Sequence, residues 1–256
     1  GDQTYFVDAV VEAVIADLMD QKNVSRGIAI KMIYTDGYKI NTTQDQSVQA
    51  AIDDAFNNPN IFYTDWDGDF MQGAMVVMDH TTGEVRGLIG GAGEKDGVLT
   101  LNRATQTHRQ PGSCMKPFGA YGPAFEQGVL SPGAGIDDTQ LTMGNWTPVN
   151  WYGYFYGYVT VREAIMNSDN IPAVRANLMV SDEDFAWNFA YNCGLTSLVE
   201  ADKTAASLAL GGVTKGFTVL EVANAYSTIA NEGYHIDPKL YTTVTDRNGD
   251  IVLDNT

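Results

Sequence analysis

Residues 109–118 read Arg-Gln-Pro-Gly-Ser-Cys-Met-Lys-Pro-Phe, so that a turn marked by glycine leads into a predicted helix. Ser113 and Lys116 are three positions apart, and on a helix such residues lie on one face with Cβ atoms ~5–6 Å apart. From there the lysine amine can take the proton of the serine hydroxyl and make Ser113 a nucleophile. Pro117 fits the first turn of a helix, where the amide groups have no acceptor within the helix. The alternative interpretation is a serine and a lysine on a solvated helix face.

A second polar element, Ser168-Asp169-Asn170, lies between two predicted helices. Residues 159–167 before it have a helical pattern, and Pro172 after it suits the first turn of the next helix. Such a triplet can simply cap a helix, or it can place a hydroxyl and a carboxamide in a cleft. S-x-x-K and S-D-N, together with a later K-T-G, form the signature of penicillin-binding proteins and class A β-lactamases.

Further segments make the chain similar to one family, the class A, bifunctional penicillin-binding proteins. The similarity covers nearly the whole chain, and the motifs occur in the family's order. Residues 5–8 and 42–51 of this chain resemble the family's linker, and residues 76–91 resemble the first hairpin of its transpeptidase domain. Residues 102–104 and 109–118 resemble the nucleophile region, and residues 208–212 and 218–226 resemble the late helix. Serine β-lactamases share the catalytic pair but not the linker or the R-Q-P-G-S run.

The resemblance implies an α/β (α+β) fold of the penicillin-binding protein and serine β-lactamase-like kind, with helices flanking an antiparallel sheet. Residues 1–70 would form a small linker or pedestal region, and residues 71–256 the transpeptidase (penicillin-binding) domain. The polar, turn-rich residues 60–73 mark this expected boundary.

The chemistry that the resemblance implies is D,D-transpeptidation of peptidoglycan through a serine acyl-enzyme, without a metal or another cofactor. Ser113 would attack the D-alanyl-D-alanine carbonyl of a stem peptide, with Lys116 as its base. Ser168 would pass a proton to the leaving nitrogen, and Asn170 would hold the substrate amide. The expected partners are the donor and acceptor stem peptides, and β-lactam antibiotics that acylate Ser113.

An aromatic run, residues 151–158, lies between the two motifs. Such a run can cover a core, but its glycine interruptions suit a loop that lines a site for a peptide. Trp151, Tyr152 and Tyr154 are therefore candidate substrate-binding residues.

The third family motif, K-T-G, has no match after Asn231. Lys203-Thr204-Ala205 resembles it, but alanine replaces the glycine and the triplet precedes residues 208–212. We therefore expect the transpeptidase domain to be incomplete at its C-terminus, with the K-T-G strand on a missing segment or on a second chain. Two alternative functions remain open at this stage, a serine β-lactamase and a non-catalytic module that senses β-lactams or acts as a scaffold.

Composition limits the class of partner. The formal charge of −17 and the sequence pI near 4.3 argue against nucleic acid, which requires a basic face. No run of eighteen apolar residues and no signal peptide occur, so an expected place on the extracytoplasmic face of the bacterial cell membrane requires an anchor outside the chain.

His80, His108 and His235 lack the spacing of metal ligands. Cys114 and Cys193 are expected to be buried thiols.

Periodicity predicts the remaining elements. Apolar residues at helical spacing predict helices over residues 6–18 and 48–56. Residues 28–34 and 38–40 predict two strands joined by a turn at Asp36-Gly37. Thr218 and Glu221 form a capping box that opens a late helix, and residues 241–245 and 251–253 predict a hairpin.

Overall fold

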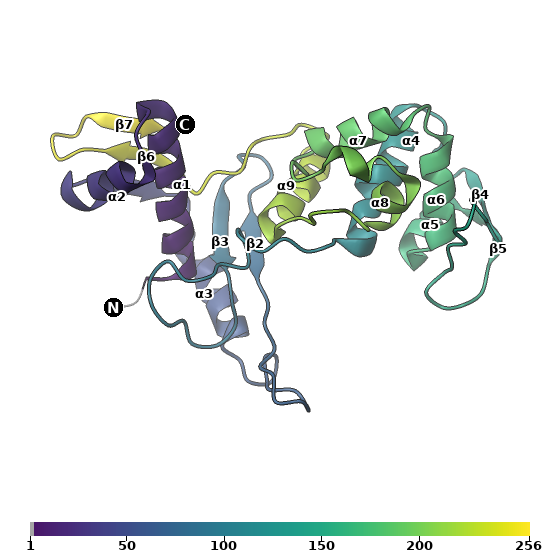
Figure 1. Ribbon diagram of the computed structural model, residues 1–256, viewed down its shortest axis with the longest axis horizontal. Helices are drawn as coiled ribbons and strands as arrows, with labels where there is room; N and C mark the ends of the chain where they lie inside the picture. The colour runs from purple at the N-terminus through teal and green to yellow at the C-terminus, as the bar shows by residue number, and fades with distance from the viewer. Residues whose placement is uncertain (1–2) are drawn as a thin grey trace. The chain divides into compact units, whose positions relative to one another are not determined.

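The structure, a computed structural model, describes residues 3–256, which form two compact units (Figure 1). Unit 1 combines residues 3–107 with residues 218–256, and unit 2 consists of the intervening residues 108–217. The boundary predicted near residue 70 lies inside unit 1. It concerns the division between linker and transpeptidase domain, and it stays a prediction.

Unit 1 builds its sheets from segments that are far apart in the sequence. Its elements are α1 (Tyr5–Lys22), α2 (Arg26–Thr35), β1 (Lys39–Thr42), α3 (Gln46–Phe56), β2 (Met75–Met78), β3 (Val85–Ile89), α9 (Val219–Ala230), β6 (Tyr241–Thr245) and β7 (Ile251–Asp254). One antiparallel sheet has the order β1-β6-β7, with Ile40 opposite Val244 and Val244 opposite Leu253. Strands β2 and β3 form a separate antiparallel pair.

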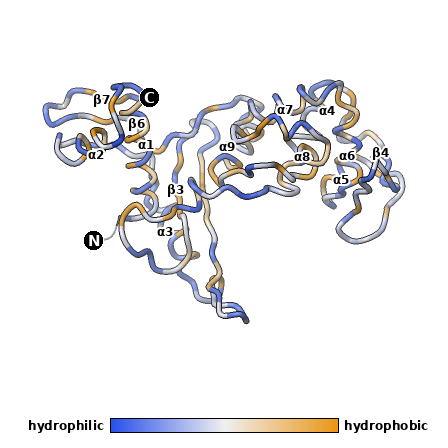
Figure 2. The backbone as a smooth tube through the Cα atoms, in the orientation of Figure 1, coloured by the Kyte–Doolittle hydropathy of each residue, from blue (hydrophilic) through white to orange (hydrophobic). Residues whose placement is uncertain are grey.

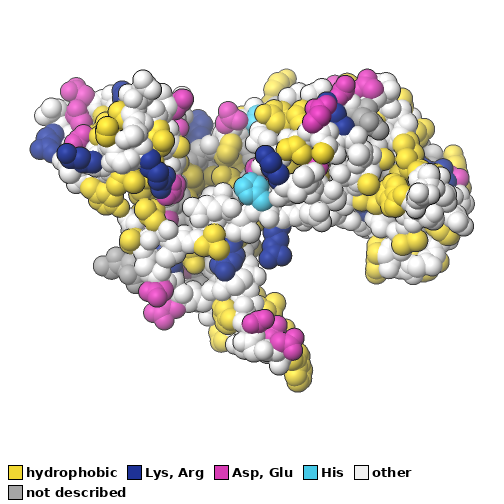
Figure 3. Space-filling model, in the orientation of Figure 1, with side chains coloured by type: hydrophobic (Ala, Val, Ile, Leu, Met, Phe, Trp, Pro, Cys, Tyr) yellow, Lys and Arg dark blue, Asp and Glu magenta, His cyan; other side chains and the backbone are white. Residues whose placement is uncertain are grey.

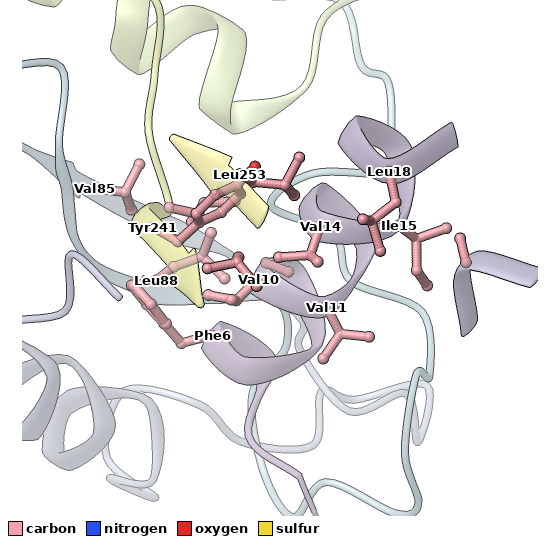
Figure 4. Packing of buried hydrophobic residues seen from close by; sticks show 14 of the residues in the cluster. Phe6, Val10, Val11, Val14, Ile15, Leu18, Val85, Leu88, Tyr241 and Leu253 are labelled. Atoms are coloured by element: carbon pink, nitrogen blue, oxygen red, sulfur yellow. The ribbon is translucent and has the colours of Figure 1, made fainter. Parts of the chain in front are cut away.

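The core of unit 1 forms where α1 meets the C-terminal strands. Phe6, Val10, Val14 and Leu18 recur at helical spacing and are almost completely buried. Figure 4 shows these side chains packed against residues of β3, β6 and β7, among them Tyr241. In Figure 2, α1 carries both apolar and polar residues along its length. The predicted first helix is therefore confirmed.

The strand predicted over residues 28–34 is wrong, because these residues lie in helix α2. Ser25 caps the helix, since its hydroxyl accepts a hydrogen bond from the Ile28 amide at 3.3 Å. Ala29 is completely buried in the cluster that contains α1, and the Arg26 guanidinium forms a two-pronged ion pair with Glu12. A short apolar run is ambiguous between strand and helix, and here packing against α1 decides. The hairpin predicted with its turn at Asp36-Gly37 is therefore also wrong, and β1 pairs with β6 instead.

The predicted second helix, the late capping box and the C-terminal hairpin are confirmed. Helix α3 begins after Asp45, whose carboxylate accepts from the amides of Ser47 and Val48. Helix α9 begins with the predicted capping box, in which Thr218 and Glu221 each accept from the other's amide. The β6–β7 hairpin also forms as expected. A long loop connects α3 to β2, and it carries acidic and apolar side chains (Figure 3).

Unit 2 is mostly helical. Its elements are η1 (a 3₁₀ turn, Gly112–Met115), η2 (a π-helical turn, Pro117–Tyr121), α4 (Gly122–Glu126), β4 (Gly135–Asp138), β5 (Gly157–Thr160), α5 (Val161–Asn167), α6 (Asn170–Met179), α7 (Glu183–Asn192), η3 (a 3₁₀ turn, Glu200–Asp202) and α8 (Ala205–Leu210). Strands β4 and β5 pair antiparallel. Gly119 lets η2 approach α8 closely, because an added Cβ would overlap the Leu208 carbonyl oxygen.

The mixed helix and antiparallel-strand class predicted from the sequence is confirmed. Within residues 3–256 the strands fall into three small sheets, with orders β1-β6-β7, β2-β3 and β4-β5. None of the helices in this described range is long and apolar enough to cross a membrane.

Candidate active site

Ser113 lies on η1, at the start of the helical segment that continues through η2 and α4. The backbone amide of Lys116 donates to the Ser113 carbonyl, so the two residues are one 3₁₀ turn apart. The helix predicted to begin near Ser113 is therefore present, although its first two turns are a 3₁₀ turn and a π turn. Ser113 and Cys114 are both exposed. The expected burial of Cys114 is wrong, whereas Cys193 is buried as expected.

The segment that precedes Ser113 is held by the chain just before α9. Arg109 and Phe217 exchange backbone hydrogen bonds of 3.0 and 2.8 Å. Gly211, at φ +79°, lies directly against the backbone of Gly112, and a Cβ at this position would overlap the Gly112 carbonyl oxygen. The residues around Gly211, which resemble a family motif, thus support the turn that presents Ser113.

Lys116 brings the two sequence motifs together. Its side chain is buried, with 4% of the residue exposed. The Lys116 ammonium donates to the carbonyl of Ser168 at 2.7 Å, to the Ser168 hydroxyl at 2.9 Å and to Oδ1 of Asn170 at 2.9 Å. Within the described residues, the side-chain hydrogen bonds of Lys116 go to the second motif and not to the Ser113 hydroxyl.

The turn that carries Ser168 and Asn170 is fixed from both sides. Helix α5 begins with a capping box of Thr160 and Glu163 and ends at Ser168, which adopts the left-handed conformation with φ 56° and ψ 44°. This conformation is uncommon for a residue other than glycine, asparagine or aspartate. On the other side, Oδ1 of Asn150 accepts from the amides of Asn170 and Ile171, at 2.9 and 3.2 Å, at the start of α6.

The protonation state of Lys116 decides what this arrangement can do. An ammonium group has three donors and no lone pair, and the three contacts satisfy it. In the neutral amine a lone pair replaces one donor, and among the three partners the Ser168 hydroxyl can donate to it. Burial lowers the pKa of Lys116 to about 8, while the negative charge of Asp169 opposes this change. Lys116 can therefore act as a proton acceptor near neutral pH.

The three aromatic candidates have different environments. Trp151 is 75% exposed and donates its indole N–H to the Asn167 carbonyl at 3.2 Å. Tyr154 is half-exposed, and its hydroxyl lies 3.1 Å from that of Tyr156. The Tyr152 hydroxyl instead donates to Asp169 at 2.6 Å. Binding of substrate by these residues stays a prediction, but the Tyr152 hydroxyl already has a partner within the protein.

Sequence reasoning missed Asn150 and Asp138, and it assigned no role to Asp169. Asn150 is almost completely buried, and its side-chain amide donates to Asp138 at 2.8 Å. Asp138 and Asp169 are completely buried. A signal for Asp169 existed, since it is the central residue of the S-D-N motif. Neither periodicity nor spacing marks Asn150 or Asp138.

Lys203-Thr204-Ala205, which resembles K-T-G, is not on a strand. Lys203 follows η3 and pairs with Asp184 at 2.5 Å and with Glu200 at 2.7 Å. Thr204 caps α8, because its hydroxyl accepts from the Ser207 amide at 3.1 Å. A strand that presents a lysine to substrate is therefore not formed by these residues.

Comparison with known proteins gives a consistent result. The family described as Penicillin binding protein transpeptidase domain matches residues 73–255. Penicillin-binding protein 1A/1B of Bacillus subtilis (strain 168) is 33% identical over 242 residues, which are 94% of this chain and 25% of that protein. Penicillin-binding protein 1A of Clostridium tetani is 32% identical over 270 residues, which are 98% of this chain and 34% of that protein. The chain thus spans a quarter to a third of these relatives.

Solved structures share the fold. The penicillin-binding protein PonA1 from Mycobacterium tuberculosis superposes with a TM-score of 0.78 at 23% identity, covering 96% of this chain and 63% of that one. The same protein in complex with penicillin V gives a TM-score of 0.77, also at 23% identity, covering 96% of this chain and 64% of that one.

Proposed function

This chain belongs to the penicillin-binding protein transpeptidase family, and from that premise we propose that it carries the nucleophile side of a peptidoglycan D,D-transpeptidase that is also a β-lactam target. The observation that carries the proposal is the placement of Lys116. It is one 3₁₀ turn from Ser113, buried, and bonded to both Ser168 and Asn170. A lysine on a merely solvated face would have none of these contacts.

The proposed reaction begins with attack of the Ser113 oxygen on the D-alanyl-D-alanine carbonyl, while neutral Lys116 takes the hydroxyl proton. The Ser113 amide N–H stabilises the oxyanion. The C–N bond then breaks, and the leaving D-alanine nitrogen receives a proton through Ser168, which Lys116 replenishes. The amine of a second stem peptide attacks the ester, loses a proton to the same pair and frees Ser113. Asn170 positions the substrate amide.

We propose the same first step for β-lactam antibiotics, whose ring amide would open and leave Ser113 esterified. Since the substrate is peptidoglycan, the site would work on the extracytoplasmic side of the bacterial membrane.

Labelling with a fluorescent penicillin tests the nucleophile. Ser113→Ala should abolish the covalent adduct, because the variant lacks the proposed nucleophile, whereas the Ser168 hydroxyl is already bonded to Lys116. Cys114→Ser is the matched control, since this neighbour is also exposed, and it should leave labelling unchanged. A mass increase on the Ser113 peptide locates the ester. Labelling that survives in Ser113→Ala and disappears in Cys114→Ser would assign the reaction to the thiol.

A K-T-G strand stays part of the proposal. By the resemblance to the family, the K-T-G strand supplies the second donor to the oxyanion. Loss of one such donor lowers the rate ~10²–10³-fold. The 256 residues should therefore be acylated slowly, and a longer chain or an added second chain that carries K-T-G should be acylated faster by that factor. Equal rates of penicillin acylation would show that the third motif lies elsewhere in these residues.

A further inference from the structure

Two buried carboxylates, Asp138 and Asp169, lie at or near the second motif, and the Tyr152 hydroxyl contacts both. Asp138 ends β4 and Asp169 precedes α6, and neither is exposed to solvent. The Tyr152 hydroxyl is 2.6 Å from Oδ1 of Asp169 and 3.4 Å from Oδ2 of Asp138. A tyrosine has a single O–H to donate, and the shorter distance assigns it to Asp169.

The two carboxylates differ in their other partners. Asp138 accepts from the Asn150 side chain at 2.8 Å and from the Tyr156 amide at 2.8 Å. Oδ2 of Asp169 accepts no hydrogen bond from any residue that the structure describes. Because an ionised carboxylate without donors is costly to bury, the charge of Asp169 depends on Tyr152 and on nearby charges.

The groups around Asp169 shift its pKa in opposite directions. Burial raises the pKa of Asp169, and the negative charge of Asp138 adds to this, while the Tyr152 hydrogen bond and the positive charge of Lys116 lower it. Burial raises the pKa of Tyr121 on η2, and the negative charges of Asp169 and Asp138 add to this. The hydrogen bond with Tyr154 raises the pKa of Tyr156, and the same two charges contribute. Asp169 is in turn the charge that opposes the lowering of the Lys116 pKa by burial.

We propose that Tyr152 and Asp169 are positioning residues that set the proton occupancy of Lys116, with Asp138 as a fixed negative charge behind them. Tyr152 keeps Asp169 ionised by hydrogen bonding, and ionised Asp169 keeps Lys116 protonated to a higher pH than burial alone would allow. The functional meaning rests on the proposed role of Lys116 as the base. The same geometry gives Tyr152 a role that differs from the substrate contact predicted from the sequence.

Direct titration of the two side chains in the intact chain tests the proposal without requiring catalysis. NMR of labelled lysine and aspartate carbons should show that Asp169→Asn lowers the pKa of Lys116 by about one unit, as expected for loss of a nearby opposite charge. Tyr152→Phe keeps the ring and removes only the hydroxyl, and it should raise the pKa of Asp169. An unchanged Lys116 pKa in Asp169→Asn, or an unchanged Asp169 pKa in Tyr152→Phe, would overturn the proposal.

Matched controls come from the same elements. Asp137→Asn removes a carboxylate next to Asp138, but its side chain is 47% exposed on the other face of β4. Tyr158→Phe removes a hydroxyl from the same aromatic run at a residue that is 77% exposed. Neither should move either pKa, and a shift in these controls equal to that in Asp169→Asn or Tyr152→Phe would overturn the specific role of the buried pair.

The pH profile of penicillin acylation separates this proposal from the proposed function. If both hold, the rising part of the profile should move to lower pH by about one unit in Asp169→Asn, because Lys116 loses its proton more easily. If the variants shift the pKa values as expected but penicillin never acylates the protein, the proposed function is rejected and the role of Tyr152 and Asp169 is kept. If Asp169→Asn is acylated normally and the pH profile of acylation does not move, the role of Tyr152 and Asp169 is rejected and the proposed function is kept.

Discussion

At the scale of single residues, burial of Lys116 matters most. A lysine that is 4% exposed, with three acceptors around it, can hold its charge, but desolvation brings its pKa down to about 8. Ser113, three positions earlier, is exposed. The pair therefore combines an accessible hydroxyl with an amine that is shielded from water, as the proposed roles of nucleophile and base require.

The pH dependence of acylation follows from the lowered pKa of Lys116. Below about pH 8 the side chain is mostly protonated and cannot accept the Ser113 proton, so the rate should fall ~10-fold for each further unit of acidity. Above that pH the rate should level off. Stopped-flow acylation by a chromogenic β-lactam measures this profile, with circular dichroism as a check on folding. A flat rate through this range would contradict the assignment of Lys116 as the base.

Removing the amine should be more harmful than removing the carboxamide. Lys116→Ala should slow acylation by ~10²–10⁴-fold, the usual contribution of a general base. Asn170→Ala should mainly raise the substrate concentration needed for half-maximal rate, because Asn170 is proposed to position the substrate. Steady-state measurements with a peptide ending in D-alanyl-D-alanine can separate the two effects. Equal and small losses, accompanied by lower melting temperatures, would indicate purely structural roles.

At the scale of elements, close contact between η2 and α8 supports the helical segment that carries Ser113 and Lys116. Gly119 has no space for a side chain, because the Leu208 carbonyl lies where a Cβ would be. Two packed backbone segments cannot yield as a flexible side chain can. The presence of glycine here is therefore a packing requirement and not a conformational one.

Substitution of this glycine tests the contact. Gly119→Ala should lower the free energy of unfolding by ~1–3 kcal/mol, because the two elements must separate. Gly133→Ala is the matched control in unit 2, since nothing lies within 4 Å of its Cβ position. It should be neutral or stabilising by ~0.4–1 kcal/mol. Chemical denaturation measures both variants, and an equal loss in the two would argue against the close approach.

At the scale of the whole molecule, the two ends of the described chain form one unit. Tyr241 of β6 is 1% exposed in the cluster that contains α1, and its hydroxyl donates to Asp17 on that helix. The C-terminal strands thus complete the core that the first helix begins. Both segments therefore contribute to the core of unit 1.

A pair of tyrosines can test this arrangement. Tyr241→Ala should lower the free energy of unfolding by ~3–5 kcal/mol, as for other large aromatic side chains removed from a core. Tyr234→Ala removes a side chain of the same type that is 73% exposed, and it should change the free energy by less than ~0.5 kcal/mol. Thermal denaturation distinguishes the outcomes. A similar small effect in both would mean that the C-terminal strands contribute little to the core.

The sequence by itself determined the features that depend on neighbours within one or two helical turns. The apolar spacing of α1, the capping box of Thr218 and Glu221, and the three-residue step from Ser113 to Lys116 are of this kind. Each could be predicted because the partners are close in the chain, so local geometry alone brings them together.

Only the tertiary structure decided which distant groups meet. The meeting of Lys116 with Ser168 spans 52 positions, and Asp138 lies 12 positions from Asn150 in the chain. Residues 28–34 became helical through packing against α1, although their pattern also suited a strand. Burial, and the pKa changes that it causes, depend on which segments cover a side chain. That covering is a property of the folded chain, and local sequence does not contain it.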